Sequence, residues 1–192
     1  MDELEDMLLE LKDTSELMID LAYSSLLYNN KEIAEEVQLM EETLDDLANR
    51  IQREAIARAV KDGDADKAFI LVKMAASVEE ISDAAMQIAD VVLRGVEPHP
   101  VISLSIRDAD SSISRAQVQD GSDLAGHTLG ELKLASQTGM WVVAIKRDRR
   151  YIYGPDADTK LLPGDLLMVR GPTDGEEYFK DVASGTEKLV LN

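Results

Sequence analysis

Apolar side chains recur at alternating steps of four and three residues through the first half of the chain, a spacing that puts them on one face of a helix. Asn29-Asn30 and Asp62-Gly63-Asp64 interrupt the pattern and divide it into three segments. The first two segments each carry one row: Leu4, Leu8, Leu11, Ser15, Met18, Ala22 and Ser25, then Ile33, Val37, Met40, Leu44, Leu47 and Ile51. The pattern predicts three long antiparallel helices between residues 3 and 94, in an up-and-down bundle.

The third segment differs, because two adjacent rows are mostly apolar. The rows are Ile70, Met74, Ser77, Ile81, Ala84, Ile88 and Val91, and Leu71, Ala75, Val78, Ser82, Ala85, Ala89 and Val92. An apolar face this wide predicts a helix packed against both neighbours. Heptad-like rows also join separate chains as coiled coils. The short turns favour a bundle within one chain, with a remaining seam available for a second copy.

The pattern changes after the third segment, which Gly95, Pro98 and Pro100 end. Residues 101–112 fit a helix and a strand about equally. Thr128, three residues before Glu131, predicts a capping box that opens a short helix, and Gly139 predicts the end of that helix.

Short β-branched and apolar runs then predict strands of a small sheet. The first is Met140 to Ile145, and Tyr151 to Tyr153 continues it as a hairpin after a charged turn. Pro163-Gly164-Asp165 predicts a tight turn into a last strand, Leu166 to Val169.

Charge divides the 192-residue chain as the hydrophobic pattern does. Residues 1–97 hold 24 acidic and 9 basic side chains, whereas residues 98–192 hold 14 and 11. The acidic first half disfavours nucleic acid as a partner. There is no cysteine, the first residues are acidic, and no apolar run approaches the roughly 20 residues of a membrane span. We therefore expect a cytoplasmic protein without direct membrane insertion.

The motifs G-x-T-L-G-E-L and L-x-P-G-D-x-L, with the strand order around them, resemble the TrkA C-terminal domain, also called the C-terminal domain of regulators of potassium conductance. In the helical half, 40–47 and 78–85 resemble helices two and three of one half of a PhoU domain. The resemblance implies an α plus α/β two-domain protein. A PhoU-like three-helix bundle would span 1–97, a linker 98–112 and a TrkA-C domain 113–185.

Two acidic pairs in the helices are candidate metal ligands. Glu41 with Asp45, and Glu79 with Asp83, are each four residues apart, so both carboxylates of a pair reach one cation. In the PhoU family such E-x-x-x-D pairs can bind metal clusters. Oxygen ligands favour magnesium, calcium, manganese or iron. The alternative is an ordinary acidic surface, since several other pairs share the spacing.

A basic cluster in the predicted hairpin is the candidate ligand site. Related TrkA-C domains bind a small ligand, sometimes cyclic di-AMP, in a dimer cleft lined by this strand and hairpin, and arginine suits phosphate oxygens. The resemblance implies contacts from Ala144, Ile145, Lys146, Arg147, Arg150, Gly154 and Pro155. The alternatives are a solvated charged turn or salt bridges to the acidic bundle.

Other chemistry has little support in the sequence. No nucleophile elbow, P-loop or G-x-G-x-x-G motif is present, and His99 and His127 each lack a second ligand nearby. We therefore expect no enzymatic activity, and give metal-assisted hydrolysis the lowest weight. The resemblances imply a cytoplasmic regulatory subunit of a potassium transport system. It would form a homodimer or higher even oligomer and attach peripherally to a membrane transporter. The alternative function is a PhoU-like metal-binding regulator of phosphate uptake or signalling.

Overall fold

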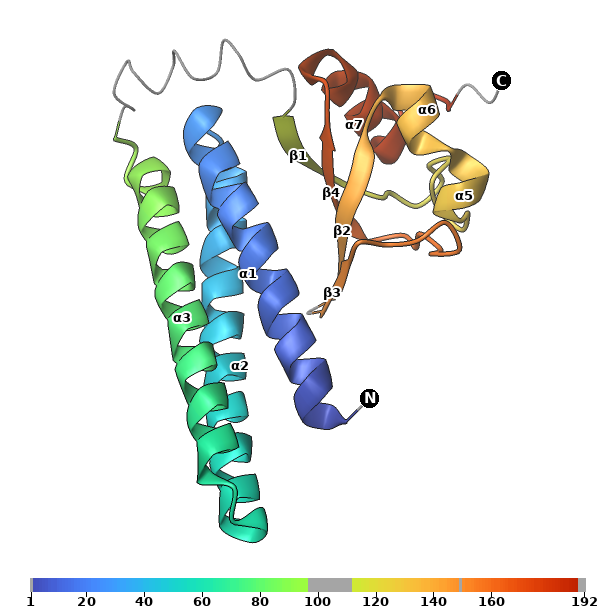
Figure 1. Cartoon of the computed structure of the whole chain (residues 1–192). Coiled ribbons are helices and arrows are strands. Elements are labelled where there is room, and N and C mark those ends of the chain that lie inside the picture. The colour runs from blue at the N-terminus through green and yellow to red at the C-terminus, as the bar shows by residue number, and fades with distance from the viewer. Residues whose placement is uncertain (1, 97–111, 149, 190–192) are drawn as a thin grey trace. The chain divides into compact units, whose positions relative to one another are not determined.

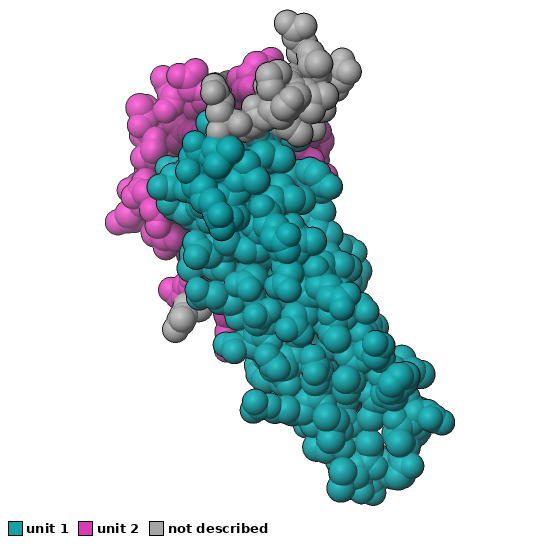
Figure 2. All heavy atoms as spheres, turned by 90° about the vertical axis from the view of Figure 1, so that its left-hand side faces the viewer, with its two compact units in different colours: residues 1–104 teal, residues 105–192 magenta. Residues whose placement is uncertain are grey.

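The computed structural model describes residues 2–96, 112–148 and 150–189 (Figure 1). The chain divides into two compact units, Met1–Leu104 and Ser105–Asn192, which Figure 2 colours separately. His99 and most of the predicted linker lie outside the described residues. In the described part of the chain, no helix has the length and apolar character to cross a bilayer.

The first unit is the predicted bundle of three antiparallel helices. They are α1 (Glu3–Leu27), α2 (Lys31–Asp62) and α3 (Ala65–Leu93). The side chain of Asn30 caps α2 by accepting from the Ile33 amide at 3.2 Å. Gly63 ends α2 in the left-handed conformation at φ 75°, which costs glycine little. The side chain of Asp64 then caps α3. The polar interruptions in the sequence therefore act as helix ends, as predicted.

Large side chains from α1 and α2 fill the core of the bundle, whereas α3 contributes mainly small ones. Every residue of the second predicted row, Ile33 to Ile51, is buried. The buried residues of α3 are Ala68, Ala75, Ser82, Ala85, Ala89 and Val92. Among them, the Ser82 hydroxyl lies 3.3 Å from the sulfur of Met18. Small residues let α3 approach its neighbours closely and leave the volume of the core to the other two helices.

Helix α3 packs against both α1 and α2, as predicted, but only one of its two apolar rows faces them. The row from Leu71 to Val92 faces the bundle, but the row that begins at Ile70 is exposed along much of its length.

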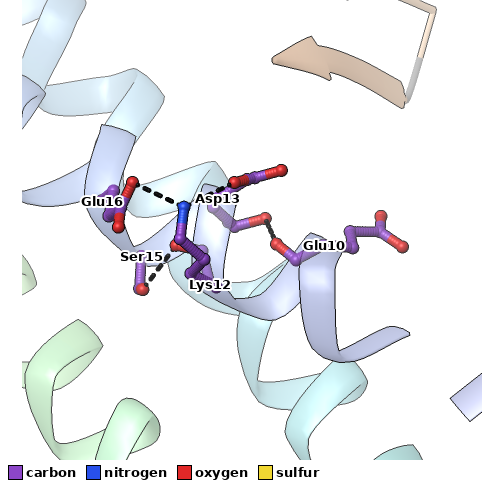
Figure 3. A network of polar contacts seen from close by, with 6 residues as sticks. Glu10, Lys12, Asp13, Ser15 and Glu16 are labelled. Atoms are coloured by element: carbon purple, nitrogen blue, oxygen red, sulfur yellow. Dashed lines mark hydrogen bonds and ion pairs between the residues drawn. The ribbon is translucent and has the colours of Figure 1, made fainter. Parts of the chain in front are cut away.

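The exposed surface of α1 is acidic and is partly neutralised by Lys12 (Figure 3). The Lys12 ammonium lies 3.0 Å from a Glu16 oxygen and 3.1 Å from an Asp13 oxygen. These two partners, Glu16 first, raise the pKa of Lys12. Exposed pairs of this kind contribute little to stability, so the network chiefly reduces repulsion along the helix.

The second unit is a four-stranded antiparallel sheet with helices on one face (Figure 1). The strands lie in the order β1-β4-β2-β3. The elements are β1 (Ser112–Gln117), α5 (Leu129–Leu132), α6 (Leu134–Thr138), β2 (Trp141–Arg147), β3 (Arg150–Tyr153), β4 (Leu166–Gly171), a 3-10 turn (Thr173–Gly175) and α7 (Glu176–Ser184). The three predicted strands are present within one or two residues.

Helices α5, α6 and α7 enclose the core of this unit. Thr128 and Glu131 form the predicted capping box, and Gly139 ends α6 at φ 76°. The predicted single helix is interrupted at Lys133, which takes the left-handed conformation at φ 49°. Phe179 of α7 is fully buried in this core.

Candidate functional site

The hairpin of β2 and β3 holds most of the predicted ligand contacts, but two of them are inaccessible. Ala144 and Ile145 are fully buried, and β2 pairs with β3 on one side and β4 on the other. Ile145 belongs to the core cluster of the unit. Their side chains therefore serve the sheet and their backbone is taken up by strand pairing, and a ligand contact at these two residues stays a prediction.

Arg147 holds together the turn that precedes β4. Its Nε and Nη2 donate to Oδ1 and Oδ2 of Asp165, each at 2.7 Å, and Nη2 also donates to the Lys160 carbonyl at 2.8 Å. Asp165 is only 1% exposed and accepts a further bond from the Leu162 amide at 2.8 Å. The carboxylate raises the pKa of Arg147. Arg147 is therefore already engaged by Asp165 and the Lys160 carbonyl, and its contact with a ligand stays a prediction.

The remaining hairpin cations lie on the outer part of the sheet. The Lys146 ammonium is 5.5 Å from the centroid of the Tyr151 ring, which stacks on Tyr153 with centroids 5.7 Å apart. Arg150 is exposed and pairs in register with Arg147. Lys146 therefore sits over an aromatic surface, and Arg150 keeps its side chain toward solvent.

A pocket of about 280 Å³ lies beside the end of β3, and Pro155 is the predicted residue that lines it. Trp141, the only tryptophan, is 60% exposed at this pocket, and Lys133 adds a cation. The other lining residues are Leu129, Gly130, Leu134, Ala135, Ser136, Met140, Val142, Asp156 and Ala157. Gly154 adjoins the pocket and takes φ 50°, donating from its amide to the Val143 carbonyl at 3.0 Å.

Sequence reasoning missed Lys133 and Trp141 because it followed the cluster of positive charge. Lys133 belonged to a predicted helix, and Trp141 belonged to a predicted buried strand. The available signal was a lone tryptophan, the first residue of β2, because tryptophan is enriched at interfaces.

Three of the four predicted metal ligands come together between α2 and α3. Glu41, Asp45 and Asp83 each offer a carboxylate oxygen, and these oxygens all lie within 4.8 Å of one another. Glu79 is not part of this group. The three carboxylates are matched to a hard cation such as magnesium, calcium, manganese or iron.

The electrostatics of the carboxylate cluster favour a counter-ion. Burial, followed by the charges of Asp45 and Asp83, raises the pKa of Glu41. Burial and the charge of Asp83 likewise raise the pKa of Asp45. In addition, Oδ1 of Asp45 is buried without a hydrogen-bond partner among the described residues. A cation would neutralise the repulsion and satisfy this oxygen.

Both units match known domain families. Residues 8–92 match the PhoU domain, and residues 113–183 match the TrkA-C domain. The chain carries a PhoU domain followed by a TrkA-C domain. The carboxylate cluster therefore lies in the PhoU domain, whereas the basic hairpin and the pocket at Trp141 lie in the TrkA-C domain.

The chain is also similar to a longer curated protein. The chain is 33% identical over 134 residues to the Ktr system potassium uptake protein A of Vibrio alginolyticus, which covers 67% of this chain. The match spans 57% of the length of that relative. The TrkA-C domain is a regulatory family rather than an enzyme family.

Solved structures with low superposition scores include RCK_C domains. The RCK_C domain dimer of S. agalactiae BusR in complex with c-di-AMP is 25% identical and has a TM-score of 0.37, covering 40% of this chain and 95% of that one. The KtrA RCK C domain in complex with c-di-AMP is 26% identical with a TM-score of 0.35, covering 43% and 93%. Scores this low add nothing to the assignment made from the sequence families.

His127 lies in the turn before α5, with its Nδ1 3.6 Å from a Glu131 oxygen. Both side chains are largely exposed. This pair lies at the surface of the TrkA-C domain, and neither residue is among those that line the pocket at Trp141.

Proposed function

We propose that this chain is a cytoplasmic regulatory subunit of a potassium uptake system. The observation that carries the proposal is the 33% identity to the Ktr system potassium uptake protein A, together with the TrkA-C domain match. On this proposal the chain attaches to a membrane transporter and sets its activity according to a ligand bound by the TrkA-C domain. A ligand acts in this way when it binds one state of an assembly more tightly than another.

The ligand site that we propose is the pocket at Trp141 rather than the arginine cluster. The exposed ring of Trp141 offers a flat surface for a base, and Lys133 offers a cation for a phosphate. At about 280 Å³ the pocket lies just below the usual range for small-molecule sites, roughly 300–1,000 Å³. The pocket has room for one nucleotide of a symmetric dinucleotide. The same pocket in the second copy of a homodimer would take the other nucleotide.

Cyclic di-AMP is the first ligand to test, because it carries two adenine bases and two phosphates. Calorimetric titration should give binding to the wild-type chain. Lys133→Ala should weaken it about tenfold or more, since a charge-assisted hydrogen bond contributes roughly 1.5–3 kcal/mol. Trp141→Ala should weaken it by a similar factor, because stacking on an aromatic ring contributes roughly 1–3 kcal/mol per base.

The matched control is Lys160→Ala, which removes an exposed lysine of the same domain that does not line the pocket. It should leave the affinity unchanged. No heat with cyclic di-AMP or with other nucleotides would contradict the ligand proposal. The transport proposal has its own test: deletion of the gene should lower potassium uptake in cells grown at limiting potassium, and unchanged uptake would contradict it.

A second candidate function is metal-dependent regulation through the PhoU domain, as in control of phosphate uptake or signalling. The close approach of Glu41, Asp45 and Asp83, together with the unpaired oxygen of Asp45, supports it. These residues would hold the cation, which would neutralise the charge between α2 and α3. Titration of metal-free protein with manganese, iron or magnesium should raise the melting temperature, because a ligand of the folded state stabilises it by mass action. No shift with any of these ions would contradict metal binding.

A further inference from the structure

The exposed apolar row of α3 has the pattern of a helix–helix interface. Ile70, Met74 and Ile81 are 63%, 42% and 43% exposed, and Ser77 is exposed between them. The row continues through Ala84, Ile88 and Val91 without a charged residue. Single exposed apolar residues are ordinary, but a continuous uncharged heptad row on one helix is typical of a surface that meets another helix.

The buried residues of α3 show that this row is not needed by the bundle. Ala75, Ser82 and Ala89 face α1 and α2, about 100° around the helix from the exposed row. Leu71 and Val78 lie between the two faces and are half-buried. The helix therefore has one face that completes its own bundle and a second face of larger side chains. In Figure 2 the viewer looks at the bundle from the side on which α3 lies in Figure 1.

Two charges of opposite sign flank the most exposed part of the row. Lys73 and Glu80 are seven residues apart on the outer side of the row, and both are exposed. Within the described residues neither side chain takes part in an ion pair. In an antiparallel pair of helices, equivalent flanking positions of the two chains face each other.

We propose that α3 pairs antiparallel with α3 of a second copy of this chain through the segment Ile70 to Ile81. In this register Ile70 packs against Ile81 of the second copy, and Met74 packs against Ser77 of the second copy. Lys73 then faces Glu80 of the second copy, and the two-fold axis repeats every one of these contacts. The most exposed residues of the row are those that this register covers.

The charges argue against a parallel pair and against other partners. In a parallel pair Lys73 would face Val78 of the second copy, which is apolar and half-buried. A nucleic acid or an anionic membrane would meet a unit with 24 acidic and 9 basic side chains. A second copy is equally acidic, and its approach is opposed by repulsion, which salt at physiological ionic strength largely screens for charges more than about 8 Å apart. The contact should therefore tighten as salt is added.

Disulfide cross-linking of the full-length chain tests the register directly, because the native chain has no cysteine. Residues 70 and 81 are 11 positions apart, or roughly 16 Å along one helix, so they cannot be bridged within one chain. The variant carrying Ile70→Cys and Ile81→Cys should form a cross-linked dimer under mild oxidation. Each single variant should remain uncross-linked, since identical residues lie far apart in the antiparallel register.

A charge exchange gives a second test. Lys73→Glu should weaken the contact and lower the yield of cross-link, and adding Glu80→Lys to it should restore the yield. Leu39→Glu is the matched control: Leu39 is 50% exposed on α2, two residues from Glu41 and so about 200° around the helix from the side that faces α3. It should leave the yield unchanged.

The outcomes separate this contact from other modes of association. Cross-linking of the single variants would indicate a parallel pair and overturn the proposal. A chain that is dimeric in sedimentation but shows no cross-link in the double variant would place the dimer contact elsewhere, which also overturns it. The test does not depend on ligand binding or on transport, so it stands or fails separately from the proposed function.

Discussion

Removal of the Arg147 guanidinium is predicted to destabilise the TrkA-C domain strongly. Arg147→Ala leaves the Asp165 carboxylate, which is 1% exposed, with the Leu162 amide as its remaining donor in place of three. Removing one partner of a buried ion pair costs about 3–5 kcal/mol, and we expect the lower end, about 3 kcal/mol, because the Arg147 side chain is itself partly exposed. In a domain of this size, that loss lowers the melting temperature by roughly 12–24 °C.

The fluorescence of Trp141 supplies the assay. It is the only tryptophan of the chain, and it lies in β2, the strand that also carries Arg147. Urea unfolding followed at this residue therefore reports on the TrkA-C domain separately from the helical bundle. A fall in the urea midpoint with an unchanged slope would give the loss of stability directly.

Arg150→Ala is the control for Arg147→Ala. Arg150 is the exposed residue paired with Arg147 across the hairpin, and its loss should change stability by no more than about 0.5 kcal/mol. Arg147→Lys should fall between the two, because lysine keeps the charge but not the two-pronged contact. Equal midpoints for Arg147→Ala and Arg150→Ala would refute the structural role of Arg147 and return it to the set of candidate ligand contacts.

Three further predictions concern the two candidate sites. Asp45→Asn combined with Asp83→Asn should abolish the rise in melting temperature caused by metal, and equal shifts in wild type and variant would make these acids ordinary surface. The pKa of Glu41 is raised in the folded state above its ordinary value of 4.5. The contribution of Glu41 to the free energy of unfolding is therefore fully favourable below pH 4.5 and is lost as the pH rises through the raised pKa. Glu41→Gln should therefore stabilise metal-free protein at neutral pH and have less effect in acid; the same gain in acid as at neutral pH would contradict this. Lys133→Ala should reduce ligand affinity without moving the Trp141 unfolding midpoint, and a large fall in that midpoint would instead make Lys133 structural.

The bundle could be predicted almost completely because its signals are local. Apolar rows of helical period in three segments, two polar interruptions and short turns leave few alternatives to an up-and-down arrangement. The helix ends follow from the same residues, since Asn30 and Asp64 cap with their side chains and Gly63 takes a positive φ. Each of these effects acts within one turn of the helix.

The small sheet was predictable for a different reason. Its strands are short, and their order in the sheet, β1-β4-β2-β3, does not follow the chain. Periodicity gave the strands but not this order, whereas the L-x-P-G-D motif marks a specific set of contacts. The Gly164 amide donates to the Val118 carbonyl at 2.8 Å, and the Val118 amide donates to the Asp165 carbonyl at 2.9 Å. The motif therefore ties the chain just after β1 to the start of β4, the strand that lies between β1 and the hairpin.

The ligand site was harder to predict, because a cluster of charge does not indicate which charges are already paired. Arg147 looks like an anion ligand in the sequence, yet its partner Asp165 is 18 residues away and lies inside the P-G-D turn. The two acidic pairs that are candidate metal ligands show the same limit of prediction from sequence. The spacing of four put Glu79 with Asp83 and Glu41 with Asp45, but the relative rotation of α2 and α3 selects Asp83 and leaves Glu79 outside the cluster.

The two rows of α3 show why a helical period identifies an apolar face without identifying what covers it. Both rows have the same spacing, so periodicity alone assigns both to the core. The choice between them follows from volume: α1 and α2 already fill the bundle with Leu11, Met18, Met40 and Leu44, which are almost fully buried. Little volume remains for α3, and the row richer in alanine and serine fits it while keeping the helices close. The row with Ile70, Met74 and Ile81 is then displaced outward, where its side chains have the size and spacing to pack against an identical helix.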